Sequence, residues 1–173
     1  EFYPGQSGSV EVAAGQLPSG NQVSISAQVF RAYQPGPALL FLAGVHGDEI
    51  NGVEIVRRCI AQKIFEKIET GTVIAIPLLN VYGFNNFSRD VPDGKDVNGG
   101  FPGTTSGSLA RRIANGLSRN ILPHIDLAVD FHTGGRGTYN FPQIRYNTED
   151  EKAALAATAF APPLVFANRA PAK

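Results

Sequence analysis

The sequence predicts an α/β fold, a three-layer sandwich in which helices cover both faces of a mixed, largely parallel central sheet. Short, continuous apolar runs are the first indication, because strands buried on both faces lack polar alternation. The second is that segments with helical spacing of apolar residues separate these runs. The runs are ALLFLAG at 38–44, VIAIPLL at 73–79 and DLAVDF at 126–131.

The elements follow one another in a regular order. VSISAQVFRA at 23–32 alternates apolar and polar residues over part of its length, which predicts an edge or antiparallel strand. Apolar spacing predicts a helix over 49–67, between the first two apolar runs, and another over 108–122, before the third. Beyond them, 148–160 is typical of a helix and 164–167 of the start of a strand.

The segment 80–108 differs from the rest, because it is dense in Asn, Asp, Gly and Pro. Its large apolar anchors are Phe84, Phe87 and Phe101. A loop of this length in a compact domain is usually functional or disordered.

Composition narrows the function classes. The 15 basic and 15 acidic side chains cancel, which disfavours nucleic acid and anionic membranes as partners. The apolar runs are far shorter than the ~20 residues of a membrane span, and residues 1–8 lack the pattern of a secretory signal. We therefore expect a cytoplasmic or already processed protein. A single cysteine, Cys59, excludes internal disulfides and thiolate metal sites, so a metal would need His and carboxylate ligands.

Two histidines stand at the ends of predicted central strands, where α/β proteins bind ligands. His46 and Glu49 form an H-x-x-E pair, and His132 adds a second nitrogen, which leaves a fourth tetrahedral position open as catalytic zinc requires. An H-x-x-E pair alone is common by chance, and Asp48 and Glu49 also suit a helix N-terminus. His124, in a predicted turn, is interpreted as a surface residue.

Three motifs resemble those of a known family. They are G-V-H-G-D-E-I-N-G at 44–52, N-V-Y-G-F…S-R-D-V-P-D-G-K-D-V-N-G-G-F-P-G at 80–103, and D-F-H-T-G-G at 130–135. In this order and spacing, over about 38–147, the chain resembles the succinylglutamate desuccinylase/aspartoacylase family of the zinc carboxypeptidase clan. The resemblance implies a zinc carboxypeptidase-like fold, with 1–37 as an N-terminal strand region and 38–173 as the N-terminal part of the catalytic domain.

The resemblance also implies site roles. The two strand-end histidines and Glu49 would bind one zinc ion per chain. Asp96 would hydrogen-bond to a metal-bound imidazole and fix its tautomer. The alternative is that Asp96 is an ordinary carboxylate in a turn. Arg89 resembles the arginine that polarises the scissile carbonyl, and Asn98 resembles a residue that holds a substrate carboxylate.

Two departures from the family pattern bear on function. Gly99 stands where the family usually has an arginine that clamps the substrate's α-carboxylate. One alternative is that Arg136 or Arg145 replaces this arginine, although both are equally plausible as surface cations. The other is that the substrate lacks an α-carboxylate. The resemblance also implies that the family's general-base glutamate lies in a strand beyond residue 173. Glu149 and Glu151 are interpreted as favourable charges at the start of the predicted last helix.

The resemblance thus predicts a zinc-dependent hydrolase that cleaves an amide bond, deacylating an N-acyl amino acid or related amine. A zinc carboxypeptidase acting on short peptides and a noncatalytic zinc-dependent binding module are the alternatives. The oligomeric state is left open.

Overall fold

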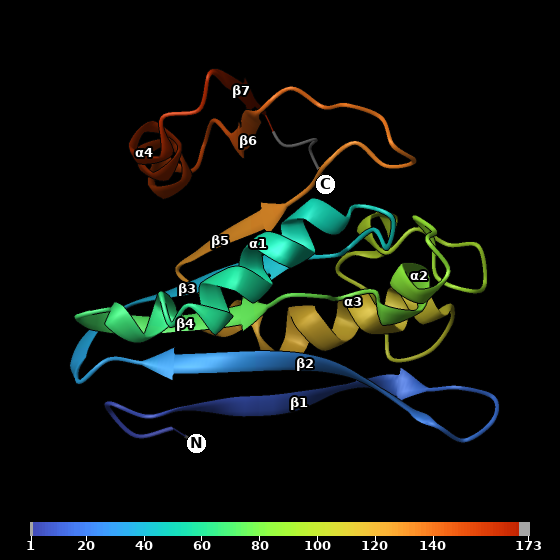
Figure 1. Ribbon diagram of the computed structural model, residues 1–173. Coiled ribbons are helices and arrows are strands. Elements are labelled where there is room, and N and C mark those ends of the chain that lie inside the picture. Colours follow the sequence, from blue (N-terminus) through green and yellow to red (C-terminus); the bar gives the residue numbers. More distant parts are fainter. Residues whose placement is uncertain (1, 170–173) are drawn as a thin grey trace. The chain divides into compact units, whose positions relative to one another are not determined.

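A five-stranded mixed sheet forms the centre of the first of two compact units, Glu1–Thr138 and Tyr139–Lys173, in a computed structural model that describes residues 2–169 (Figure 1). The strand order is β1-β2-β4-β3-β5. The strands are β1 (Ser7–Gln16), β2 (Gln22–Arg31), β3 (Gln34–Ala43), β4 (Thr70–Ile76) and β5 (Leu127–Phe131).

The three continuous apolar runs form the parallel part of this sheet. β3 pairs in parallel with β4 on one side and with β5 on the other. β1 and β2 extend the sheet by antiparallel pairing, first β2 with β4 and then β1 with β2. The segment 23–32 is therefore antiparallel, as predicted, and β1 occupies the edge outside it.

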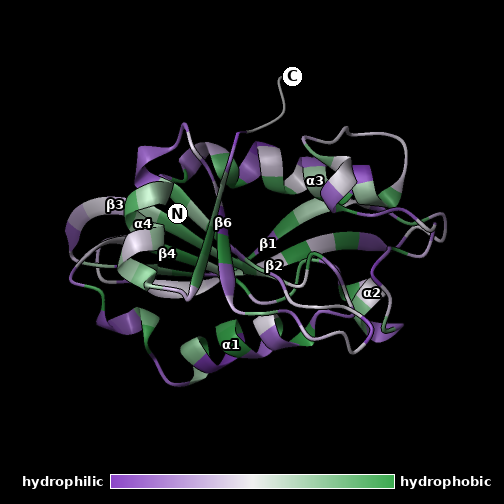
Figure 2. Ribbon diagram, turned by 90° about the horizontal axis from the view of Figure 1, so that it is seen from above, coloured by the Kyte–Doolittle hydropathy of each residue, from purple (hydrophilic) through white to green (hydrophobic). Residues whose placement is uncertain are grey.

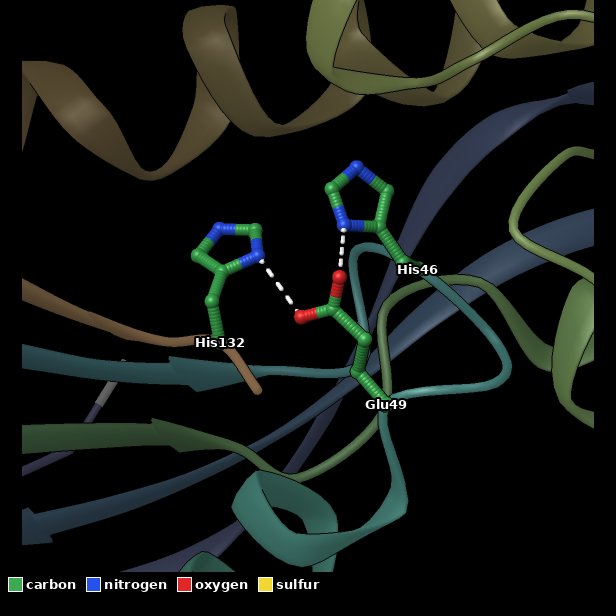
Figure 3. Close-up of side chains that lie close together, drawn as sticks. All are labelled: His46, Glu49 and His132. Carbon is green, nitrogen blue, oxygen red and sulfur yellow. Dashed lines mark hydrogen bonds and ion pairs between the residues drawn. The ribbon is translucent and has the colours of Figure 1, made fainter. Parts of the chain in front are cut away.

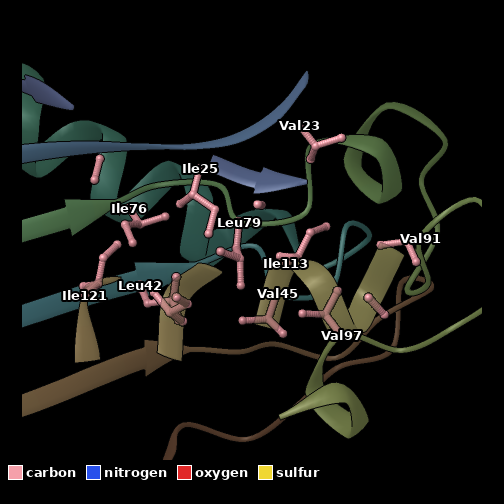
Figure 4. Packing of buried hydrophobic residues seen from close by; sticks show 14 of the residues in the cluster. Val23, Ile25, Leu42, Val45, Ile76, Leu79, Val91, Val97, Ile113 and Ile121 are labelled. Atoms are coloured by element: carbon pink, nitrogen blue, oxygen red, sulfur yellow. The ribbon is translucent and has the colours of Figure 1, made fainter. Parts of the chain in front are cut away.

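Helices cover both faces of the sheet, as the predicted three-layer fold requires (Figure 2). On one face, α1 (Ile50–Ala61) and the 3₁₀ turn η1 (Phe65–Lys67) pack Val56 and Phe65 into a small cluster with β4. On the other face, α3 (Leu109–Asn120) contributes Ile113 and Leu117 to the larger cluster, which Figure 4 shows. These findings confirm the predicted mixed α/β fold class.

The segment 80–108 folds into short elements rather than an unstructured loop. It contains α2 (Val81–Asn85) and the 3₁₀ turn η2 (Asn98–Gly100). The Ser108 hydroxyl at its end accepts a hydrogen bond from the Arg111 main-chain N at 3.3 Å and so caps the N-terminus of α3. The turn η3 (Leu122–His124) follows α3 and leaves His124 exposed, as predicted.

The second unit consists of β6 (Gln143–Asn147), α4 (Glu151–Phe160) and β7 (Leu164–Asn168), with β6 and β7 parallel. α4 and β7 lie where the sequence predicts a helix and a strand. Asp150 caps α4 by accepting a hydrogen bond from the Ala153 N at 2.9 Å. Within the described residues, no helix has the length and apolar character needed to cross a bilayer.

Candidate metal centre

The parallel pairing of β3 with β5 brings the two predicted histidines together. Ala43, at the end of β3, pairs with Phe131, at the end of β5, and His46 and His132 follow within three residues. Gly44 takes the left-handed φ of +65° that turns the chain out of β3. The two imidazole centroids consequently lie 4.9 Å apart.

Glu49 stands between the two imidazoles at the N-cap of α1 (Figure 3). Its Oε1 lies 2.7 Å from His46 Nδ1 and its Oε2 lies 3.0 Å from His132 Nδ1. One ligand atom from each residue lies within 4.8 Å of the others. His46 and Glu49 are buried, at 3% and 4% exposure, whereas His132 faces the solvent side of the site.

The Nε2 atom of each imidazole lies beside the carboxylate of a different aspartate. His46 Nε2 lies 3.2 Å from Asp96 Oδ1, and His132 Nε2 lies 2.8 Å from Asp130 Oδ2. Asp96 therefore lies beside His46, and its support of a metal-bound imidazole stays a prediction. The sequence reasoning did not assign Asp130, although side chains two residues apart on a strand share one face, so the D-x-H spacing could have indicated it.

These contacts test whether the three residues suit a metal. An ionised carboxylate only accepts hydrogen bonds, so each Nε2 must carry the proton that it donates to its aspartate. The two Nδ1 atoms then face the Glu49 carboxylate and can each offer a lone pair to a cation bound between the three side chains. Two imidazole nitrogens and one carboxylate oxygen are the donor set that zinc accepts, and carboxylate partners behind the imidazoles are typical of zinc sites.

Arg89 points its guanidinium at the same space. Its Nη1 lies 3.2 Å from His46 Nδ1 and 3.6 Å from Glu49 Oε1. Its Nε and Nη2 donate to Asp96 Oδ2 at 3.1 and 2.9 Å. The Arg89 side chain is 44% exposed, so the cation is accessible from solvent while its orientation is fixed by Asp96.

The comparison with protein families identifies the family of this chain. The succinylglutamate desuccinylase/aspartoacylase catalytic domain matches residues 35–173. The chain belongs to the succinylglutamate desuccinylase/aspartoacylase family. The members of this family are deacylases that hydrolyse amides, and the resemblance seen in the sequence motifs is confirmed.

Individual relatives of the family support the same assignment. An N-alpha-acetyl-L-2,4-diaminobutyric acid deacetylase of Halomonas elongata is 32% identical over 134 residues, which are 74% of this chain and 39% of that protein. An aspartoacylase family protein of Mesorhizobium loti has a TM-score of 0.83 at 26% identity, covering 95% of this chain and 53% of that one. A succinylglutamate desuccinylase/aspartoacylase of Rhodobacter sphaeroides has a TM-score of 0.78 at 31% identity. The match covers 92% of this chain and 50% of that one.

The chain thus spans about half the length, or less, of these relatives. The division of the sequence into 1–37 and 38–173 stays a prediction.

Burial, hydrogen bonds and neighbouring charges shift the pKa values of Glu49, Asp96 and His132. Burial alone would raise the pKa of Glu49, but the Thr133 main-chain hydrogen bond and the two imidazoles outweigh it, and the pKa is lowered. Burial acts in the same direction on Asp96, where the Asn98 main-chain hydrogen bond and Arg89 prevail and lower the pKa. The hydrogen bond to Asp130 raises the pKa of His132 against the effect of burial.

The remaining residues predicted for this family site lie in different surroundings. Asn98 is exposed and donates its main-chain N–H to Asp96 Oδ1 at 2.8 Å. Gly99 is exposed, and a Cβ added there would meet no atom within 4 Å. Arg136 is exposed, whereas Arg145 belongs to the second unit and lies over the Phe166 ring at 5.7 Å. Replacement of the clamp arginine by Arg136 or Arg145 stays a prediction.

The two acidic residues Glu149 and Glu151 lie near the N-terminus of α4, where the sequence places them. Glu151 lies in the first turn of α4. Glu149 precedes the helix and forms an ion pair with Arg169 at 3.5 Å. Both positions agree with their interpretation as favourable charges at a helix N-terminus.

Proposed function

We propose that the protein is a zinc-dependent hydrolase that cleaves the amide bond of an N-acyl amino acid or a related amine. The observation that carries the proposal is the convergence of His46, Glu49 and His132 on one space, with the Arg89 guanidinium directed at it. Zinc bound there would polarise the amide carbonyl and lower the pKa of a water molecule to roughly 7.

The side chains of this chain would divide the remaining work. Arg89 would donate hydrogen bonds to the carbonyl oxygen as its negative charge develops. Asp96 and Asp130 would hold the imidazoles in the tautomer that leaves Nδ1 free to bind zinc. Asn98, beside Asp96, would contact the carboxylate of the substrate. A general base would take up the proton of the attacking water.

The name of the Halomonas elongata relative suggests a substrate class. That protein is a deacetylase of an N-acetylated diamino acid. We therefore propose small N-acyl amino acids and N-acyl amines as substrates. The carboxypeptidase alternative predicts hydrolysis of dipeptides instead, and the binding-module alternative predicts bound zinc without hydrolysis. A cytoplasmic location also stays a proposal.

The first experiment measures zinc content and hydrolysis in the full-length protein, with and without a chelator, on N-acyl amino acids, N-acyl amines and dipeptides. We expect one zinc per chain and deacylation that the chelator abolishes. A folded protein without bound metal would refute the ligand assignment.

Arg89→Ala tests the role of the guanidinium. Loss of one donor to a developing oxyanion costs about 10²- to 10³-fold in turnover, so kcat should fall by this factor while zinc content stays the same. Arg119→Ala, which removes an exposed arginine in the last turn of α3, is the matched control. Unchanged turnover in Arg89→Ala would exclude the proposed role.

A further inference from the structure

Asn80 is a fully buried polar side chain, with 0% exposure, that lies between β4 and α2. Its Oδ1 accepts a hydrogen bond from the Gly83 N at 2.8 Å, and its Nδ2 donates to the Arg89 carbonyl oxygen at 3.3 Å. Its main-chain N donates to the Gly44 carbonyl oxygen at 2.8 Å. A buried amide is costly unless hydrogen-bonded, and both side-chain polar atoms of Asn80 are.

These hydrogen bonds join three separate parts of the candidate site. Gly44 precedes His46 in the turn after β3, Gly83 lies in α2, and Arg89 carries the guanidinium that faces the ligands. Asn80 is therefore bonded both to the turn that carries His46 and to the main chain of Arg89.

Two glycines, Gly47 and Gly83, allow close contacts between α2, the main chain before Arg89 and the turn that carries His46. A Cβ added at Gly83 would lie 2.4 Å from Asn80 Nδ2 and 2.7 Å from the Ser88 carbonyl oxygen. A Cβ added at Gly47, next to His46, would lie 1.9 Å from the Gly83 carbonyl carbon. The Ser88 N also donates to the Gly83 carbonyl oxygen at 2.8 Å. The main chain just before Arg89 is thus packed through α2 onto the turn that holds the ligands.

We propose that Asn80 is a positioning residue, which fixes the main chain of Arg89 so that the guanidinium faces His46 and Glu49. This inference rests on the proposed function, since it assigns Asn80 a part in the same reaction. Asn80 acts through Arg89 and is not itself a catalytic residue. The plain alternative is that Asn80 only caps α2 through its Oδ1.

Asn80→Asp separates these two roles. Aspartate keeps the oxygen that accepts from Gly83, and it is as good an N-cap as asparagine. It replaces the Nδ2 donor with a second acceptor, which faces the Arg89 carbonyl oxygen unfavourably. Asn85→Asp makes the same chemical change at an exposed residue of α2 and is the matched control.

The test measures kcat, KM and zinc content of the full-length protein in the wild-type and Arg89→Ala backgrounds. Displacement of a positioned group by about 1 Å can cost about 10²-fold, so Asn80→Asp should lower kcat by about 10- to 100-fold with zinc content unchanged. In the Arg89→Ala background the same change should have no further effect. An equal loss in both backgrounds, an unchanged kcat, or an equal loss in Asn85→Asp would overturn the proposal.

A second readout does not depend on hydrolysis. The Nε–H of Arg89, held by Asp96, gives an NMR signal that is assigned by its absence in Arg89→Ala. We expect Asn80→Asp to shift or broaden it, and an unchanged signal would overturn the positioning role. If the wild-type protein hydrolyses no amide, the proposed function fails while this measurement still decides the inference. If Asn80→Asp does not fold, Asn80→Ser, which keeps the cap oxygen and lacks the donor, replaces it.

Discussion

Gly47→Ala should disrupt the turn that carries His46 and Glu49. The added Cβ would lie 1.9 Å from the Gly83 carbonyl carbon and 2.1 Å from the Phe84 N, where ordinary contacts begin at 3.4 Å. The two main-chain segments must therefore separate by about 1.5 Å, the difference between 3.4 and 1.9 Å. Neither segment can rotate a side chain away, because the opposing atoms are backbone.

The expected cost follows from this distance. Overpacking a filled interior by a methyl group lowers the free energy of unfolding by about 1–3 kcal/mol. We expect about 3 kcal/mol for Gly47→Ala, because both contacting atoms belong to the main chain and cannot move aside easily. In a domain of about 150–250 residues this lowers Tm by about 6–12 °C. The affected turn carries His46 and Glu49, so zinc affinity should fall as well.

The assay is thermal unfolding of the full-length protein with a chelator present, followed by zinc titration. Gly99→Ala is the matched control, because its Cβ would meet no atom within 4 Å, and it should melt like the wild-type protein. If Gly47→Ala melted within about 2 °C of Gly99→Ala and bound zinc equally well, the reasoning from close packing would be refuted.

Two further predictions concern charges. Asp130→Asn should weaken zinc binding by about 10- to 100-fold, because the carboxylate that holds His132 Nε2 is lost. Competition with a chromophoric chelator measures the zinc affinity, and an unchanged affinity would contradict this prediction. Glu54→Gln removes the partner of Arg57 and Arg58, whose hydrogen bonds lower the pKa of Glu54 from 4.5 to about 2. This carboxylate stabilises the fold above pH 4.5 and loses its effect as pH falls towards about 2. The small difference in Tm from wild type, measured without metal, should therefore be present at pH 7 and shrink in acid, and a difference that grows in acid would contradict the assignment.

The sequence allows prediction of β3, β4 and β5, because strands buried on both faces are continuous apolar runs. It does not allow prediction of β1 in the same way. SGSVEVAAGQ is rich in small and polar residues, and its exposure alternates along an edge. β1 depends on hydrogen bonds to β2 and on packing against α3, which apolar periodicity in one segment does not reveal.

The candidate site divides in the same manner. His46 and His132 stand out because they follow buried strands, and parallel pairing brings strand ends together. Asn80 does not stand out in an Asn-rich segment, since its importance lies in contacts with Gly44 and Arg89. Its place just before α2 indicates an N-cap, but this position does not predict the hydrogen bond from Asn80 Nδ2 to the Arg89 carbonyl oxygen.

The order of the candidate ligands along the chain has a mechanical consequence. Glu49 and His132 are 83 residues apart in sequence, yet both contribute to one site at the ends of β3 and β5. A metal ion held by them would be a removable cross-link that closes a long loop and fastens β5 to β3. Because such an ion binds only the folded chain, the free energy of its binding adds to the free energy of unfolding. Metal availability would then govern how firmly β5 stays attached to β3, as well as whether the site is active.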